Sequence, residues 1–353
     1  MLKQKMDLYW DFNACHLVLE FSEDKWALLF CLYMDFSWQV MRGSWIPQIN
    51  PWALSLPIVV LMSGLVMCVG HAGVMAIYLY QRKISASFFQ KFWDWSWQEY
   101  ALYDLQEMIR YVYTVTNSRV FVIGYSQGTI ISLAAFTEPD TVQMVGAAAL
   151  LCPITYLNHM TARLPLRLVK MHLTQVLLAV GIHELNFKSD WGTRIMEMMC
   201  DRHVDCGDLL SSITGKNCCF NSSRIDFYLE YEPHPSSTKN LNHLFQMIRK
   251  GTFAKYDYGF WKNLKHYGQL KPPKFDLSQI PSSLPLWMGY GGNDALADVT
   301  DLQHTLKELQ SKPDLLYLEN YGHLDFLLST RAKEDVYDKM LAFFDSLGTH
   351  SSY

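Results

Sequence analysis

The stretch Val120–Ile131, VFVIGYSQGTII, joins a short apolar and β-branched run to a helix-like run of small and apolar residues through Gly-x-Ser-x-Gly. This pattern is typical of a nucleophile elbow, in which a serine on a tight strand-to-helix turn presents its hydroxyl at the edge of a parallel sheet. Glycines two residues before and after Ser126 keep side chains away from the neighbouring strand and helix. An ordinary glycine turn is the alternative for the pentapeptide alone, but the flanking strand and helix patterns favour the elbow.

The composition is that of a globular protein without a basic surface run. The chain has 353 residues, of which 50% are hydrophobic and 18% charged, and its net charge is −4. This length suits one large α/β domain with an insertion, or two modest domains. Because the net charge of the chain is slightly negative, we expect no binding to nucleic acid.

Strand-like and helix-like segments alternate on both sides of the elbow. Before it, Ser96 and Glu99 form a capping-box pattern, and apolar residues recur at helical spacing from Leu102 to Val112. After it, we expect a helix over 127–136, a buried strand over 146–152, a strand over 285–290, a helix over 299–310, a strand over 315–318 and a closing helix over 334–347. This alternation predicts a mainly parallel sheet with right-handed crossovers.

The alternation breaks between these two halves. Helical patterns over Leu164–Leu178, Trp191–Met199 and Leu241–Lys250 flank a cysteine-rich stretch there. We interpret this region as a cap that excludes water from the site below, with an unrelated second domain as the alternative. The expected divisions are an atypical N-terminal region 1–91, a first core part 92–153, the cap 154–273 and a second core part 274–353.

Two further residues stand where partners of Ser126 are expected. A serine hydroxyl needs a base to take its proton, commonly a histidine oriented by a carboxylate. Asp294 follows the strand over 285–290 and His323 follows the strand over 315–318. Because loops at the carboxyl ends of parallel strands converge, we predict that Ser126, Asp294 and His323 meet as nucleophile, acid and base.

Other residues compete for the acid and base roles. Asp325, two residues after His323, is an alternative orienting carboxylate, whereas we expect Asp298 to lie in the first turn of a helix. The histidines in or near the cap are expected to be surface or packing residues; they are His159, His183, His203, His234 and His243.

Four of the eight cysteines fall within twenty residues, at Cys200, Cys206, Cys218 and Cys219. We expect disulfides here, with free thiols and a metal site as alternatives. No Cys-x-x-Cys pair, the spacing that zinc favours, occurs. The sequon Asn221-Ser222-Ser223 beside them hints at a glycoprotein with a secretory history, and a chance match is the alternative.

Residues 51–80 contain no Asp, Glu, Lys or Arg. One interpretation is a membrane span with the cytoplasmic flank at Gln81-Arg82-Lys83. The other is two buried strands around the turn Gly70-His71-Ala72-Gly73. Charged residues interrupt the first twenty positions, so we expect no signal peptide there.

Six blocks together carry a resemblance to a known family. They are FWDWSWQE at 92–99, GYSQG at 124–128, AALLCPI at 148–154, TGKNCC at 214–219, GGND at 291–294 and YGHLDF at 321–326. From about Phe92 to Leu347 the chain resembles the acid lipase family of α/β-hydrolases, which contains gastric and lysosomal acid lipases, and is most similar to the plant triacylglycerol lipase branch.

The resemblance implies an α/β-hydrolase fold with a helical cap insertion and hydrolysis of neutral lipid esters through an acyl-enzyme. It implies Ser126 as nucleophile, Asp294 as orienting acid, His323 as base and the backbone N–H of Gln127 as an oxyanion donor. It implies a lipid interface, no metal or organic cofactor, and no obligate protein partner. Family members are typically secreted or sent to lysosome-like or vacuole-like compartments, so the compartment stays open.

Two departures from the family pattern stand out. Tyr125 occupies a position where the family usually has histidine, and we expect little consequence. Upstream, the family's His-Gly-Leu-like loop, which supplies the second oxyanion donor, has only Gly70-His71-Ala72-Gly73 as a candidate. Losing one such donor costs about two to three decades in rate. A catalytically impaired remnant is therefore the alternative function, and a shifted reading frame or odd splice before residue 92 is a hypothesis for the departure.

Overall fold

A five-stranded parallel sheet forms the centre of the protein. The computed structural model describes residues 7–11, 16–20, 27–29, 58–62, 90–186, 209–219 and 235–348. The strand order is β10-β9-β6-β5-β4, and every neighbouring pair is parallel. The strands are β4 (Ile58–Met62), β5 (Val120–Tyr125), β6 (Val145–Leu151), β9 (Leu286–Gly291) and β10 (Asp314–Leu318). The predicted parallel sheet is confirmed.

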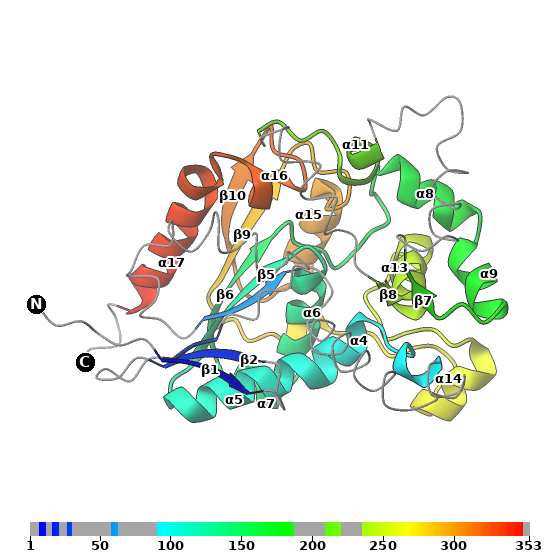
Figure 1. Cartoon of the computed structure of the whole chain (residues 1–353), viewed down its shortest axis with the longest axis horizontal. Coiled ribbons are helices and arrows are strands. Elements are labelled where there is room, and N and C mark those ends of the chain that lie inside the picture. Colours follow the sequence, from blue (N-terminus) through cyan, green and yellow to red (C-terminus); the bar gives the residue numbers. More distant parts are fainter. Residues whose placement is uncertain are drawn as a thin grey trace, which may run out of the picture.

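Helices cover both faces of this sheet. Figure 1 shows α17 (Asp338–Gly348) on one face, and α6 (Gln127–Phe136) and α15 (Val299–Glu308) on the other. Phe344 of α17 stacks on Phe121 of β5, with ring centroids 4.9 Å apart. Shorter elements link these layers: α7 (Pro139–Val142), η6 (Leu277–Gln279), α16 (Asp325–Leu328) and the π-helical turn η7 (Lys333–Tyr337).

The chain enters the core through a helix that starts at Trp97. The segments α4 (Trp97–Glu99), η3 (Tyr100–Asp104) and α5 (Leu105–Thr116) follow one another without interruption. The N–H of Ser96 donates to Glu99 Oε2 at 2.7 Å, as the capping-box pattern predicts. Trp97 is fully buried and stacks on His243, with ring centroids 4.4 Å apart.

The region between β6 and β9 is largely helical. It contains α8 (Arg163–Lys170), α9 (Leu173–Ala179), β7 (Glu184–Leu185), α11 (Leu209–Thr214), β8 (Ser236–Ser237), α13 (Thr238–Lys250) and α14 (Phe260–Tyr267). The helix expected over 164–178 is broken, because His172 has a positive φ of 51°. The α13 helix begins at Thr238 because the Ser237 hydroxyl caps it, accepting from the N–H groups of Lys239 and Asn240. The helix expected over 191–199 lies outside the described residues.

Among the residues that the structure describes, the N-terminal region contributes one strand to the main sheet. Within the charge-free stretch 51–80, β4 pairs in parallel with β5, with Ile58 opposite Phe121. The structure thus supports a strand at 58–62, and the rest of that stretch, including the turn at 70–73, lies outside the described residues. Further upstream, β1 (Asp7–Asp11), β2 (His16–Glu20) and β3 (Ala27–Leu29) form an antiparallel sheet. Among the helices in the described part of the chain, none combines the length and apolarity needed to cross a membrane.

Replacing Trp97 by alanine should destabilise the protein by about 3–5 kcal/mol, because it empties a fully buried site between the core and α13. The matched control is Trp261→Ala, since Trp261 is 76% exposed and should change stability by less than about 0.5 kcal/mol. Urea unfolding of the two variants measures the difference. Equal losses would contradict the packing role assigned to Trp97.

Candidate active site

Ser126 occupies the turn between β5 and α6 with a backbone that few L residues adopt. Its φ is 54° and its ψ is −120°, a strained combination typical of nucleophile elbows. Its N–H donates to Leu151 O of β6 at 3.0 Å, which fixes the turn to the sheet. A Cβ on Gly124 would lie 3.0 Å from the carbonyl oxygen of Gly128, so the two glycines let strand and helix approach closely.

His323 and Asp294 meet Ser126 at the carboxyl edge of the sheet. His323 Nε2 lies 2.8 Å from Ser126 Oγ, and His323 Nδ1 lies 2.8 Å from Asp294 Oδ2. The carboxylate can only accept, so the neutral ring carries its proton on Nδ1 and accepts the serine proton at Nε2. Both the imidazole and the carboxylate are buried, and each residue follows the strand end at which the sequence places it.

Asp294 is held in place by its own loop. Its Oδ1 accepts the N–H groups of Leu296 and Ala297, both at 2.9 Å, which leaves Oδ2 for the imidazole. Asp298 caps α15 by accepting from the N–H of Thr300, so it lies one position before the first turn expected for it. The geometry therefore assigns the contact with the histidine to Asp294.

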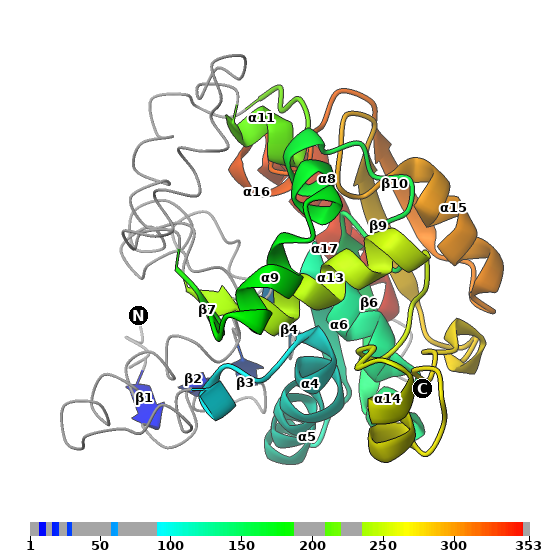
Figure 2. The same cartoon turned by 90° about the vertical axis from the view of Figure 1, so that its right-hand side faces the viewer.

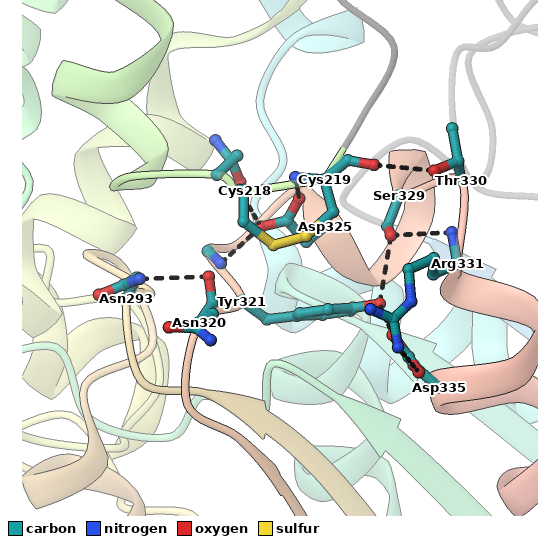
Figure 3. The surroundings of a disulfide bond; sticks show 12 residues. Cys218, Cys219, Asn293, Asn320, Tyr321, Asp325, Ser329, Thr330, Arg331 and Asp335 are labelled. Atoms are coloured by element: carbon teal, nitrogen blue, oxygen red, sulfur yellow. Dashed lines mark hydrogen bonds and ion pairs between the residues drawn. A yellow bond between two sulfur atoms is a disulfide. The ribbon is translucent and has the colours of Figure 1, made fainter.

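Asp325, the alternative orienting acid, has other partners and does not contact the imidazole. It accepts the N–H groups of Cys218 and Cys219 at 2.9 and 3.0 Å and that of Gly322 at 2.8 Å (Figure 3). The alternative is wrong, because His323 Nδ1 contacts Asp294 Oδ2 instead. The carboxylate instead joins the cysteine loop to the loop that carries His323.

The loop 214–219 connects the loop that carries Asp294 to the loop that carries His323. Thr214 O accepts the N–H groups of Ala295 and His323, at 3.4 and 3.3 Å, and Asn217 Oδ1 accepts that of Leu324 at 2.9 Å. A disulfide joins Cys218 to Cys219 (Figure 3). Two sulfurs bonded to each other are not thiolate ligands, so this pair does not fit the metal alternative. Cys200 and Cys206 lie outside the described residues.

Gln127 is the first residue of α6. The N–H groups in the first turn of a helix have no acceptor within the helix. The side-chain Oε1 of Gln127 accepts from Asn240 Nδ2 at 3.2 Å, and Asn240 Oδ1 accepts from the N–H of Trp97 at 2.8 Å. The elbow is therefore linked to the cap helix α13 and to the start of α4. No local pattern indicates this link, because the three residues lie far apart along the chain.

The histidines of the cap region are packing and surface residues where the structure describes them. His243 is buried with Nδ1 3.0 Å from Ser96 Oγ and Nε2 3.0 Å from Ala254 O, and its burial lowers its pKa to about 3. His159 is half-exposed and its Nδ1 contacts Asp301 at 2.7 Å. His183 is half-buried and lies directly before β7, and His203 and His234 lie outside the described residues.

Known proteins similar to this chain are lipases. No family model matches the sequence. Triacylglycerol lipase 1 of Arabidopsis thaliana is 61% identical over 264 residues, covering 75% of this chain and 67% of that protein. Triacylglycerol lipase 2 of the same plant is 36% identical, covering 85% and 73%, and human gastric triacylglycerol lipase is 30% identical, covering 71% and 64%. The chain belongs to the acid lipase family of α/β-hydrolases.

Family membership makes the chain a lipase-type carboxylic ester hydrolase. Among solved structures, a soluble variant of a monoglyceride lipase from Saccharomyces cerevisiae matches with a TM-score of 0.46 and 12% identity, covering 69% of this chain and 68% of that one. The α/β-hydrolase fold is shown here by the parallel sheet, the elbow and the strand-end loops themselves.

Tyr125, where the acid lipase family usually has histidine, contacts the backbone of His323 through its side chain. Its hydroxyl donates to the carbonyl oxygen of His323 at 3.0 Å, and the two rings lie 5.1 Å apart. Burial raises the pKa of Tyr125 well above its ordinary value, so the hydroxyl stays protonated and can donate. No local sequence pattern indicates this contact, and from the sequence alone we expect little consequence of the substitution.

Tyr125→Phe should lower kcat by about threefold to thirtyfold with little change in KM, because removing the hydroxyl leaves the buried carbonyl of His323 without this donor. Tyr156→Phe is the matched control, since that hydroxyl donates to Glu308 on α15. The control should change stability without changing kcat. Steady-state kinetics with a soluble ester measure both, and an unchanged kcat in Tyr125→Phe would count against the contact.

Asp294→Asn and Asp325→Asn should separate orientation of the base from support of its loop. Asp294→Asn should lower kcat by about 10⁴-fold, because an amide no longer fixes the tautomer of His323. Asp325→Asn should mainly lower the melting temperature, because its amide group faces backbone N–H donors. Kinetics corrected for the folded fraction measure the contrast, and the reverse pattern would exchange the two roles.

Proposed function

We propose that this protein hydrolyses carboxylic esters of neutral lipids through a serine acyl-enzyme. The observation that carries the proposal is the continuous hydrogen-bonded chain from Ser126 Oγ through the imidazole of His323 to Asp294. Two relatives are named triacylglycerol lipases, which supports an acylglycerol as the substrate class. The names of these relatives also favour an active hydrolase over the alternative of an impaired remnant.

In the proposed first half-reaction, Ser126 Oγ attacks the ester carbonyl carbon and its proton passes to His323 Nε2. Asp294 stabilises the imidazolium through Nδ1–H. The carbonyl oxygen, now negative, faces the N–H of Gln127 at the start of α6, where the helix dipole also favours negative charge. The tetrahedral intermediate collapses, the C–O bond breaks, and the alcohol leaves with the proton from His323.

In the second half-reaction a water molecule replaces the alcohol. His323 takes a proton from the water as the oxygen attacks the acyl-enzyme carbonyl. Collapse breaks the bond to Ser126 Oγ, which regains a proton from the imidazolium, and the fatty acid is released. The same base thus serves both halves, and no redox or metal step is needed for the atoms to balance.

A burst experiment tests the proposal. With a short-chain p-nitrophenyl ester, the protein should release about one equivalent of p-nitrophenol quickly before a slower steady state, because this reactive ester acylates Ser126 faster than water deacylates it. Ser126→Ala should show no burst and a kcat lower by about 10⁴-fold or more. Triacylglycerol emulsions then test the substrate class. Equal turnover by the protein and the Ser126→Ala variant would overturn the nucleophile assignment.

A further inference from the structure

A buried asparagine on α13, Asn240, connects the first turns of two other helices. Its Oδ1 accepts the N–H of Trp97, the first residue of α4, at 2.8 Å. Its Nδ2 donates to Oε1 of Gln127, the first residue of α6, at 3.2 Å. Figure 2 shows α13 close to α4 and α6. Because Asn240 is only 4% exposed, both bonds form away from bulk water.

The N–H of Trp97 sets the direction of both bonds. A backbone N–H can only donate, so the amide oxygen of Asn240 faces Trp97 and its NH₂ group faces the nucleophile elbow. An NH₂ group can also only donate, so Gln127 turns its side-chain carbonyl oxygen toward Asn240. Asn240 thereby fixes the position of the acceptor atom in the Gln127 side chain.

The Gln127 amide depends on this bond. Its Nε2 is buried and has no acceptor in the part of the chain that the structure describes. Loss of the bond to Asn240 would therefore leave both ends of the amide without a described partner. A buried carbonyl oxygen in that state lowers its free energy by reaching a free donor.

Free donors lie at the start of the helix that carries this side chain. Among the described residues, neither the N–H of Gln127 nor that of Gly128 has an acceptor. A Gln side chain in the first turn of a helix can bond such N–H groups, as it does in a capping box. In the proposed reaction, the N–H of Gln127 meets the negative oxygen of the tetrahedral intermediate. A released side-chain oxygen would compete with the reacting oxygen for this donor.

We infer that Asn240 is a positioning residue that keeps the N–H of Gln127 available to the oxyanion. It does so by binding the side-chain carbonyl of Gln127 and holding it toward α13. The inference rests on the proposed function, in which this N–H stabilises the tetrahedral intermediate. The effect falls on kcat, because the N–H is needed when negative charge develops on the oxygen.

Asn240→Asp tests the inference, because a carboxylate still accepts the N–H of Trp97 but no longer donates to Gln127. With a soluble p-nitrophenyl ester, kcat should fall by about tenfold to a hundredfold while KM changes by less than about threefold. Asn240→Ser, which is neutral and shorter, is a second variant and should change kcat in the same direction. Thermal unfolding gives the folded fraction by which each kcat is corrected.

Asn242→Asp is the matched control. Asn242 lies on the same helix and is as buried as Asn240. Its Oδ1 accepts from Thr174 Oγ1 at 2.8 Å and its Nδ2 donates to the Tyr256 hydroxyl at 2.6 Å, so these bonds do not reach α6. The control should lower the melting temperature while kcat per folded molecule stays within about twofold of the parent.

A double-mutant cycle separates positioning from the charge that Asn240→Asp introduces. Gln127→Met keeps the backbone N–H at position 127 and removes the side-chain oxygen. The quantity compared is the ratio of kcat without and with Asn240→Asp, measured in the parent and in the Gln127→Met background. This ratio should be about tenfold or more in the parent and below about threefold in Gln127→Met, since no competing oxygen remains there.

The outcomes distinguish this inference from the proposed function. Equal ratios in the two backgrounds would overturn the inference, because the loss would then come from the new charge or from the packing of α13. A loss confined to KM, or an equal loss of kcat in Asn242→Asp, would overturn it as well. A parent protein that turns over esters no faster than Ser126→Ala would instead reject the proposed function, and with it the inference.

Discussion

The strained backbone of Ser126 is the constraint on which the site depends. A φ of 54° with a ψ of −120° is costly for a residue with a side chain, and it persists only because its surroundings fix it. The N–H of Ser126 is bound to β6, and its carbonyl accepts the N–H of Thr129 as α6 begins. Because β5 lies between β4 and β6, the strand that delivers the serine cannot shift without breaking the sheet. The hydrogen bonds of the sheet thus keep the Ser126 hydroxyl directed toward His323.

The elbow also anchors the cap. Asn240 on α13 bonds both the Gln127 side chain and the N–H of Trp97, so one amide joins the cap, the elbow helix and the entry to the core. Beside it, the Ser237 hydroxyl lies 2.7 Å from the carbonyl oxygens of Trp93 and Trp95. These bonds connect α13 to the segment that leads into α4.

Sequence patterns predicted the features that depend on local spacing. The elbow, the strands β5, β6, β9 and β10, and the placement of Asp294 and His323 follow from short runs and strand ends, because parallel strands bring their carboxyl ends together. The features that escaped prediction depend on contacts between distant residues. The hydroxyl of Tyr125 reaches the carbonyl of His323 across 198 positions, and no local pattern signals such a contact.

The two buried carboxylates near His323 differ in the groups that their oxygens contact. Both oxygens of Asp325 accept backbone N–H groups, three in all. These bonds join the loop 214–219 to the loop that carries His323. Asp294 receives two N–H groups on Oδ1 alone, and its second oxygen remains for the imidazole. Residue type and position in the sequence made either one a candidate. The geometry decides between them, because Asp294 Oδ2 lies 2.8 Å from His323 Nδ1, whereas the oxygens of Asp325 face the backbone N–H groups of its neighbours.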